Sequence, residues 1–144
     1  LVKGGERVLD IGTGSGILAI AALKLGAAKA EGVDIDPMCV RTAGENAALN
    51  GVQNDLTVLV GGLSEKATGV YDVICANIVA NAIIHLVPNV PALLAKHGTF
   101  LASGIIDTRK DEVIAAVQAA GLALREVKEK NGWVALVCGH TGRE

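Results

Sequence analysis

Short apolar runs and longer Ala- and Leu-rich runs alternate along the chain, with glycine-containing turns between them. The short runs predict five strands, at 7–11, 30–35, 56–60, 72–77 and 99–103. The longer runs predict helices at 17–25, 37–50, 81–95 and 111–120. Asp36 is a residue type that caps helix N-termini, and Pro37 behind it suits a first helical position. We expect the helix over 81–95 to break near Pro88.

Strands that are separated by helical segments pair in parallel through right-handed crossovers. The two last apolar runs, 122–127 and 133–137, are joined through Asn131-Gly132, which is the strongest short hairpin signal. The predicted fold class is therefore α/β, a doubly wound and mostly parallel seven-stranded sheet with a C-terminal antiparallel hairpin. Sheets of this kind bind ligands at the carboxyl ends of their strands, so the motifs at strand ends carry the functional information.

Composition narrows the class of protein. The chain has 144 residues, of which 51% are hydrophobic and 19% charged, which excludes intrinsic disorder and predicts one folded domain. A net charge of −2 and 2% aromatic residues indicate no nucleic-acid surface. Cys39, Cys75 and Cys138 form no C-x-x-C pair, so we expect no metal site and no disulfide framework. Polar residues and prolines interrupt the uncharged stretch 73–95, so we expect no membrane contact and a cytoplasmic location.

A glycine loop follows the first predicted strand. Gly12, Gly14 and Gly16 form a G-x-G-x-G pattern, and Ile17 stands where a dinucleotide fingerprint has its third glycine. Asp10 lies two residues ahead of Gly12, where a carboxylate would repel a pyrophosphate and attract a cation. At about 4 Å and an effective dielectric constant near 20, that attraction is about 4 kcal/mol before desolvation. This charge favours the cationic S-adenosylmethionine over NAD.

An acidic residue also ends the second predicted strand. α/β nucleotide-binding folds place a ribose-binding acid about 20 residues after the first glycine of the loop. Asp34 stands at about this spacing from Gly12. Its carboxylate would accept hydrogen bonds from both ribose hydroxyls. The alternative is that Asp34 is only a turn residue.

Asn77 ends the fourth predicted strand. Its side-chain oxygen could accept a hydrogen bond from an amine substrate and aim the nitrogen lone pair at a methyl group; the alternative is a helix-capping role. No residue stands out as a general base. His85 shares a helical face with Asn81 and Asn89, and such a stripe is more often only solvated. Trp133 is expected to pack within the hairpin.

Four segments carry a family resemblance: VLDIGTGSGILAIAALKLGA, GVDIDP, ENAALNG and YDVICANIVAN. Together they resemble the catalytic domain of the methyltransferases that act on ribosomal large-subunit protein eleven (PrmA type), over essentially the whole chain. The glycine loop is common to class I methyltransferases, whereas Asn77–Asn81 (NIVAN) is similar to the more specific N-I-L-A-N of this family. The resemblance implies S-adenosylmethionine as cofactor and lysine or N-terminal amines of a ribosomal protein as substrate.

By position, the resemblance also implies roles for individual residues. The methionine part of the cofactor would lie against Asp10, Gly12, Thr13, Gly14 and Gly16, the ribose against Asp34, and the adenine against Gly62 and Leu63. Ile35 would also contact the cofactor, and Asn77 would lie beside the reacting centre and hold the substrate amine. Gly62 has no side chain to bond the adenine amino group. No metal is implied.

The residue at position 80 bears on the substrate. Relatives that methylate planar amide or adenine groups use N-P-P-Y-like motifs, and Ala80 stands at the place of their aromatic ring. A tetrahedral amine needs no stacking partner, so Ala80 favours an amine. We expect residues 1–144 to form a single methyltransferase domain, monomeric or weakly dimeric, without the family's N-terminal substrate-recognition domain. The alternatives are an inactive cofactor-binding or interaction module and, disfavoured by Asp10 and Ile17, an NAD-dependent oxidoreductase.

Overall fold

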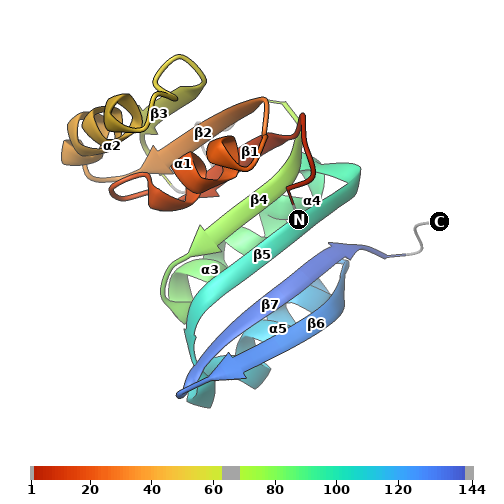
Figure 1. Ribbon diagram of the computed structural model, residues 1–144. Helices are drawn as coiled ribbons and strands as arrows, with labels where there is room; N and C mark the ends of the chain where they lie inside the picture. The colour runs from red at the N-terminus through yellow and green to blue at the C-terminus, as the bar shows by residue number, and fades with distance from the viewer. Residues whose placement is uncertain (1, 63–68, 142–144) are drawn as a thin grey trace.

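The computed structural model describes residues 2–62 and 69–141, and the strands in these ranges form one seven-stranded sheet (Figure 1). Its order is β3 (Leu56–Val60), β2 (Lys29–Asp34), β1 (Arg7–Ile11), β4 (Tyr71–Asn77), β5 (Leu94–Ile106), β7 (Trp133–His140) and β6 (Leu122–Lys130). The strands from β3 to β5 are parallel, and β7 runs antiparallel to both β5 and β6. The predicted fold class is confirmed.

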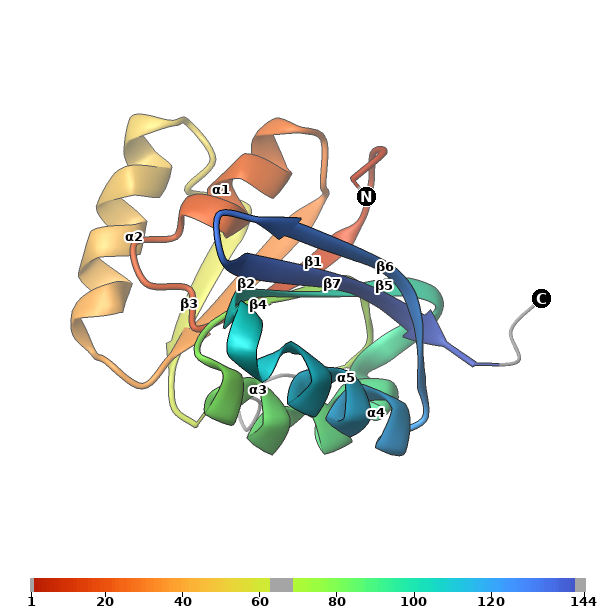
Figure 2. The same cartoon turned by 90° about the horizontal axis from the view of Figure 1, so that it is seen from below.

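Helices lie on both faces of the sheet. Figure 2 shows α3 (Ala80–Leu86), α4 (Val90–Leu93) and α5 (Lys110–Ala119) together on one face. The larger apolar core lies under these helices, and its biggest buried side chains are Tyr71 and Phe100. On the other face, α1 (Ile17–Lys24) packs its alanines and Leu23 on β1, while α2 (Met38–Leu49) flanks β3. Small residues let α1 approach the sheet closely, and the short loop 12–16 places the N-terminus of α1 at the carboxyl end of β1.

The predicted turns at α2 and at the hairpin are confirmed. The Asp36 carboxylate accepts a hydrogen bond from the backbone N–H of Met38 at 3.0 Å, and the backbone of Pro37 is helical. Asn131 and Gly132 adopt positive φ angles of 53° and 83°, the conformation that a tight two-residue hairpin turn requires. None of the helices in the described ranges combines the length and the apolar character that a membrane crossing needs.

The predicted boundary between the helix over 81–95 and the next strand is wrong. The helical region is interrupted by a 3-10 turn, η1 (Val87–Asn89), as Pro88 predicts, but it ends at Leu93. The strand β5 then runs for 13 residues, past the predicted end at 103, to Ile106. A bulge between Ala102 and Ile105 allows this extension, and Gly104 within it has a φ of 78°. A second 3-10 turn, η2 (Asp107–Arg109), connects β5 to α5.

Candidate active site

The carboxyl ends of β1, β2 and β4 meet at one edge of the sheet (Figure 1). Ile11 in β1 is in register with Val33 on one side and with Ala76 on the other. The loops that follow these three strands therefore start side by side. The structure thus brings together the glycine loop, Asp34 and Asn77, as the sequence predicts.

The three glycines of the loop all have positive φ angles, of 74° at Gly12, 56° at Gly14 and 85° at Gly16. A Cβ on Gly12 would lie 2.5 Å from Cγ2 of Ile78, and one on Gly16 would lie 2.9 Å from Cβ of Ala43. These two glycines are therefore needed for packing within the protein. Gly14 differs, because a Cβ there would meet no atom within 4 Å. The loop at Gly14 faces open space, where a ligand can approach the backbone.

Asp10 lies beneath this loop and is only 2% exposed. The Thr13 hydroxyl donates a hydrogen bond to its Oδ2 at 2.8 Å. Burial raises the pKa of Asp10 to about 6, against the lowering effect of the bond from Thr13. At neutral pH the site therefore holds a poorly hydrated carboxylate, which a nearby cation would stabilise.

Asp34 connects the end of β2 to the glycine loop. Its Oδ2 accepts a hydrogen bond from the backbone N–H of Gly14 at 3.0 Å, and its Oδ1 accepts one from the N–H of Asp36 at 3.1 Å. Burial alone would raise the pKa of Asp34, but these backbone donors outweigh it, so that the pKa is lowered and the group is ionised. Asp34 is thus a turn residue in this structure; the ribose contact stays a prediction.

Asn77 is exposed at the end of β4, where it is in register with Ser103 of β5. Its side-chain oxygen lies against Gly104, at which a Cβ would come within 2.5 Å of that oxygen. Within residues 2–62 and 69–141, the side-chain amide of Asn77 makes no hydrogen bond. The next residue, Ile78, contacts Gly12 and so joins this corner to the glycine loop. An unoccupied amide at this edge is available to a substrate.

Of the remaining predicted cofactor residues, Gly62 and Ile35 lie beside the end of β2, and Leu63 is not described. The N–H of Gly61 donates to the backbone oxygen of Asp34 at 3.0 Å, which sets the turn containing Gly62 beside the end of β2. Ile35 exposes 69% of its surface next to Asp34. Leu63 lies outside the described residues. In the described part of the chain, no three His, Cys, Asp or Glu side chains are grouped in a way that could hold a metal ion.

The comparisons with known proteins decide the family. The family described as ribosomal protein L11 methyltransferase (PrmA) has a model that matches residues 1–141. The chain belongs to this family. The ribosomal protein L11 methyltransferase of Desulforamulus reducens is 44% identical over 138 residues, which are 96% of this chain and 45% of that protein. That of Symbiobacterium thermophilum is 47% identical over 137 residues, or 95% of this chain and 44% of that protein. The chain thus spans about 45% of the length of such relatives.

Solved structures agree with this membership of the PrmA family. A crystal structure titled ribosomal protein L11 methylase, from Lactobacillus delbrueckii subsp. bulgaricus, superposes with a TM-score of 0.92 at 34% identity, covering 97% of this chain and 72% of that chain. The tRNA m1G37 methyltransferase of M. jannaschii shares the fold at 18% identity, with a TM-score of 0.81 over 99% of this chain and 45% of that one.

The structure of this PrmA-family chain argues against a catalytic role for His85. The helix α3 starts beside Asn77 at Ala80, and His85 is exposed in its last turn. Five residues of helix correspond to about 7.5 Å along the axis, directed away from the carboxyl edge. Asn81, on the predicted stripe, accepts a hydrogen bond from Arg109 at 2.6 Å. We therefore interpret His85 as a residue of the solvent-exposed face of α3.

Sequence reasoning missed Trp133. The prediction that it packs within the hairpin is wrong, because it is 56% exposed. Together with Gly104 and Val79 it lines a hollow of about 240 Å³ next to the corner of Asn77. One feature of the sequence could have indicated that Trp133 lies near the site. It directly follows the Asn-Gly turn, and this turn lies at the edge of the sheet where β5 ends.

Proposed function

We propose that this chain binds S-adenosylmethionine and transfers its methyl group to an amine of a protein, with a ribosomal large-subunit protein as the substrate. One observation carries the proposal: a buried carboxylate, Asp10, lies under a glycine loop that is open at Gly14, on the sheet edge that also presents the unoccupied amide of Asn77. The relatives from Desulforamulus reducens and Symbiobacterium thermophilum, both ribosomal protein L11 methyltransferases, support the same activity and substrate.

The described residues fit this cofactor. The loop from Asp10 to Gly16 would hold the methionine part, with the buried acid favouring a cationic group. Asp34 already accepts two backbone hydrogen bonds, but each carboxylate oxygen has two lone pairs, which leaves capacity for the ribose hydroxyls. Gly62 and the exposed apolar surface of Ile35 would lie beside the adenine. When bound, the cofactor would supply a methyl group attached to a sulfonium sulfur, which leaves with the bond's electron pair as a neutral thioether.

Asn77 would position the acceptor. Its side-chain oxygen would accept a hydrogen bond from the amine N–H, which orients the nitrogen lone pair for in-line attack. The amine must first lose a proton. For a lysine of pKa about 10.4 this costs about 4.6 kcal/mol at pH 7, whereas an N-terminal amine of pKa about 8 costs about 1.4 kcal/mol. An apolar environment favours the neutral amine and lowers this cost.

Calorimetry with S-adenosylhomocysteine and with NAD tests the proposal. We expect the sulfur ligand to bind and NAD not to bind. Tight NAD binding without binding of the sulfur ligand would refute the proposal in favour of an oxidoreductase. Cofactor binding without methyl transfer from labelled S-adenosylmethionine to ribosomal protein L11 or to any amine-bearing protein would favour the inactive cofactor-binding module instead.

A further inference from the structure

Trp133 lies next to the candidate active site and has no role in the proposed reaction. It is in register with Ile106 at the end of β5 and with Lys130 at the end of β6. It exposes 56% of its surface, although the residue type has a large apolar ring. It is also the only tryptophan in the sequence.

Two hollows adjoin Trp133. A groove of about 410 Å³ is lined by Ser103, Lys128 and Lys130 among others, and the hollow of about 240 Å³ is lined by Val79, Ile106 and Arg109 among others. Trp133 and Gly104 line both. Because Gly104 lies against the side-chain oxygen of Asn77, a chain bound across Trp133 would pass the residue that we propose to hold the amine.

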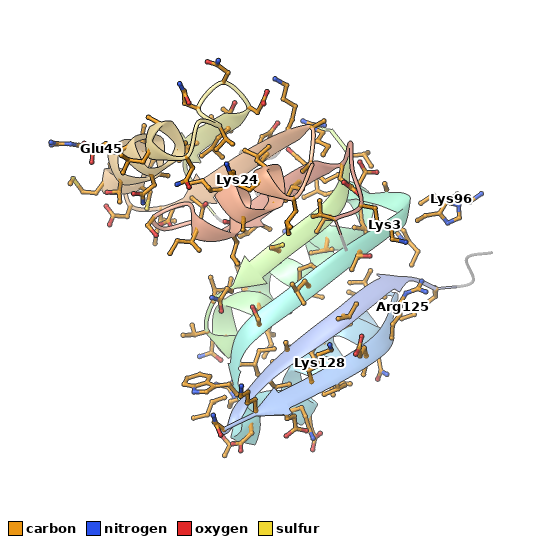
Figure 3. All side chains as sticks on the ribbon, viewed as in Figure 1. Lys3, Lys24, Glu45, Lys96, Arg125 and Lys128 are labelled. Carbon is orange, nitrogen blue, oxygen red and sulfur yellow. The ribbon has the colours of Figure 1, made fainter. Side chains whose placement is uncertain are left out.

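The larger groove is basic. Figure 3 shows Lys128 on the hairpin formed by β6 and β7. Glu129 also lines this groove, but its carboxylate pairs with Lys110 at 2.7 Å. Lys128 forms a long ion pair with Glu126 at 3.4 Å, in which both side chains are mostly exposed, so solvent screens it and it is weak. In the described part of the chain Lys130 has no ion pair. The groove therefore keeps an excess of positive charge and complements an acidic group.

The smaller hollow is apolar. Val79 and Ile106 expose 69% and 47% of their surfaces toward solvent. The charge of Arg109 is compensated within the wall, because its guanidinium donates to both carboxylate oxygens of Glu112 and to the side chain of Asn81. What remains for a ligand is aliphatic surface beside the indole of Trp133.

We propose that Trp133 separates two subsites for the protein segment that carries the target amine. The groove of Lys128 and Lys130 takes an acidic residue of that segment, and the hollow of Val79 and Ile106 takes an apolar one, with the indole contacting the chain between them. The inference rests on the proposed function and specifies its substrate: an amine with an acidic neighbour on one side and an apolar neighbour on the other.

The single tryptophan makes the proposal directly measurable. Short peptides with one central lysine would be titrated into the chain with S-adenosylhomocysteine present, while the Trp133 emission is recorded. Peptides with Leu and Asp on the two sides, in both orders, are compared with peptides in which Lys replaces the Asp. We expect a saturable emission change and at least about tenfold tighter binding for one of the Asp peptides than for its Lys counterpart, which is about 1.4 kcal/mol, because the Asp is attracted by the groove and the Lys repelled. Equal affinities, or an emission that no peptide changes, would overturn the proposal.

Two variants sharpen the test. The double substitution Lys128→Glu and Lys130→Glu should reverse the preference, so that the peptide with Lys binds more tightly. The matched control, Lys24→Glu with Lys96→Glu, makes the same change in net charge at exposed lysines of α1 and β5 and should leave the preference as in the parent chain. If both double variants weaken the Asp peptide equally, the effect is one of net charge and the groove is not the site.

Failure of the two-subsite proposal can be distinguished from failure of the proposed function. Binding of S-adenosylhomocysteine is measured calorimetrically in the same samples. A chain that binds this ligand but shows no peptide preference refutes the two subsites alone. A chain that discriminates the peptides but does not bind the sulfur ligand refutes the methyltransferase proposal and keeps a peptide-binding groove at Trp133.

Discussion

The Asp10 carboxyl group combines burial with a charge, and the raised pKa of about 6 is the measurable result. The pKa of Asp in an unfolded chain is about 3.9, so the folded state binds this proton more tightly than the unfolded state. The stability that Asp10 contributes is therefore complete below about pH 4 and is lost as the pH rises to about 6, by about 3 kcal/mol.

Asp10→Asn should remove this pH dependence. Between about pH 4 and pH 7.5, the variant should gain about 3 kcal/mol in free energy of unfolding relative to the parent chain, because it has no carboxylate to desolvate. Urea unfolding at the two pH values measures this difference. The same variant should bind S-adenosylhomocysteine at least about tenfold more weakly, since the attraction for its ammonium group is gone. Parallel pH curves for the two proteins would show that Asp10 is not the titrating group.

Also at the residue scale, Asn77→Ala distinguishes a role in positioning the acceptor amine from a role in binding the cofactor. Methyl transfer should fall by at least about a hundredfold, because the amine loses the group that orients it, as in other cases of lost positioning. The affinity for S-adenosylhomocysteine should change less than twofold, since the methionine and ribose contacts are made by other loops. Asn54→Ala, at an exposed position outside the site, is the control. Full activity of Asn77→Ala would remove Asn77 from the mechanism.

At the scale of elements, the glycine loop allows a paired comparison. Gly12 and Gly14 both have positive φ angles, but of these two only Gly12 lies where an added Cβ would meet another segment, at Ile78. Gly14→Ala should therefore cost about 1 kcal/mol of stability from backbone strain alone, and it should lower ligand affinity because the methyl group occupies the open face of the loop. Gly12→Ala should cost about 1–3 kcal/mol more than Gly14→Ala, because its methyl group clashes with Ile78.

Thermal unfolding with and without S-adenosylhomocysteine distinguishes the two variants. For Gly14→Ala, the stabilisation by the ligand should be smaller while the melting temperature of the free protein falls by only a few degrees. For Gly12→Ala, the free protein itself should melt at a lower temperature. If the two variants lose equal stability, the contact of Gly12 with Ile78 does not matter, and the account of this loop is wrong.

The sequence predicts elements best where one local signal is sufficient. The strand β1, the start of α2 at Asp36 and the Asn-Gly hairpin each follow from neighbouring residues. The strand β5 does not, because Lys96 and His97 interrupt its apolar pattern and the Gly104 bulge extends it. The same bulge shapes the two hollows. Their walls come from segments near positions 79, 104 and 133, and no local pattern indicates that these segments meet.

At the scale of the whole molecule, the alternation of strands and helices predicts the topology, and the topology then gathers the motif residues. Parallel strands end at the same edge, so Asp10, Asp34 and Asn77 needed only to stand at strand ends to be brought together. The hydrogen bond from Gly14 to Asp34 and the contact of Ile78 with Gly12 join these loops into one unit. Contacts of this kind depend on the register between strands, which the sequence pattern does not specify.

The pH dependence of methyl transfer combines these scales in one measurement. With S-adenosylmethionine below its KM, kcat/KM should rise about tenfold per pH unit between about 7 and 9 for a lysine acceptor, because the fraction of neutral amine rises in that way, and it should level off near pH 8 for an N-terminal amine. Below about pH 6 the slope should approach two, because Asp10 then takes up a proton as well. In Asp10→Asn the slope should stay at one down to about pH 5, with lower values throughout. A profile that is flat from about pH 6 to 9 would contradict an amine acceptor that must lose its proton, and would require a different substrate group at Asn77.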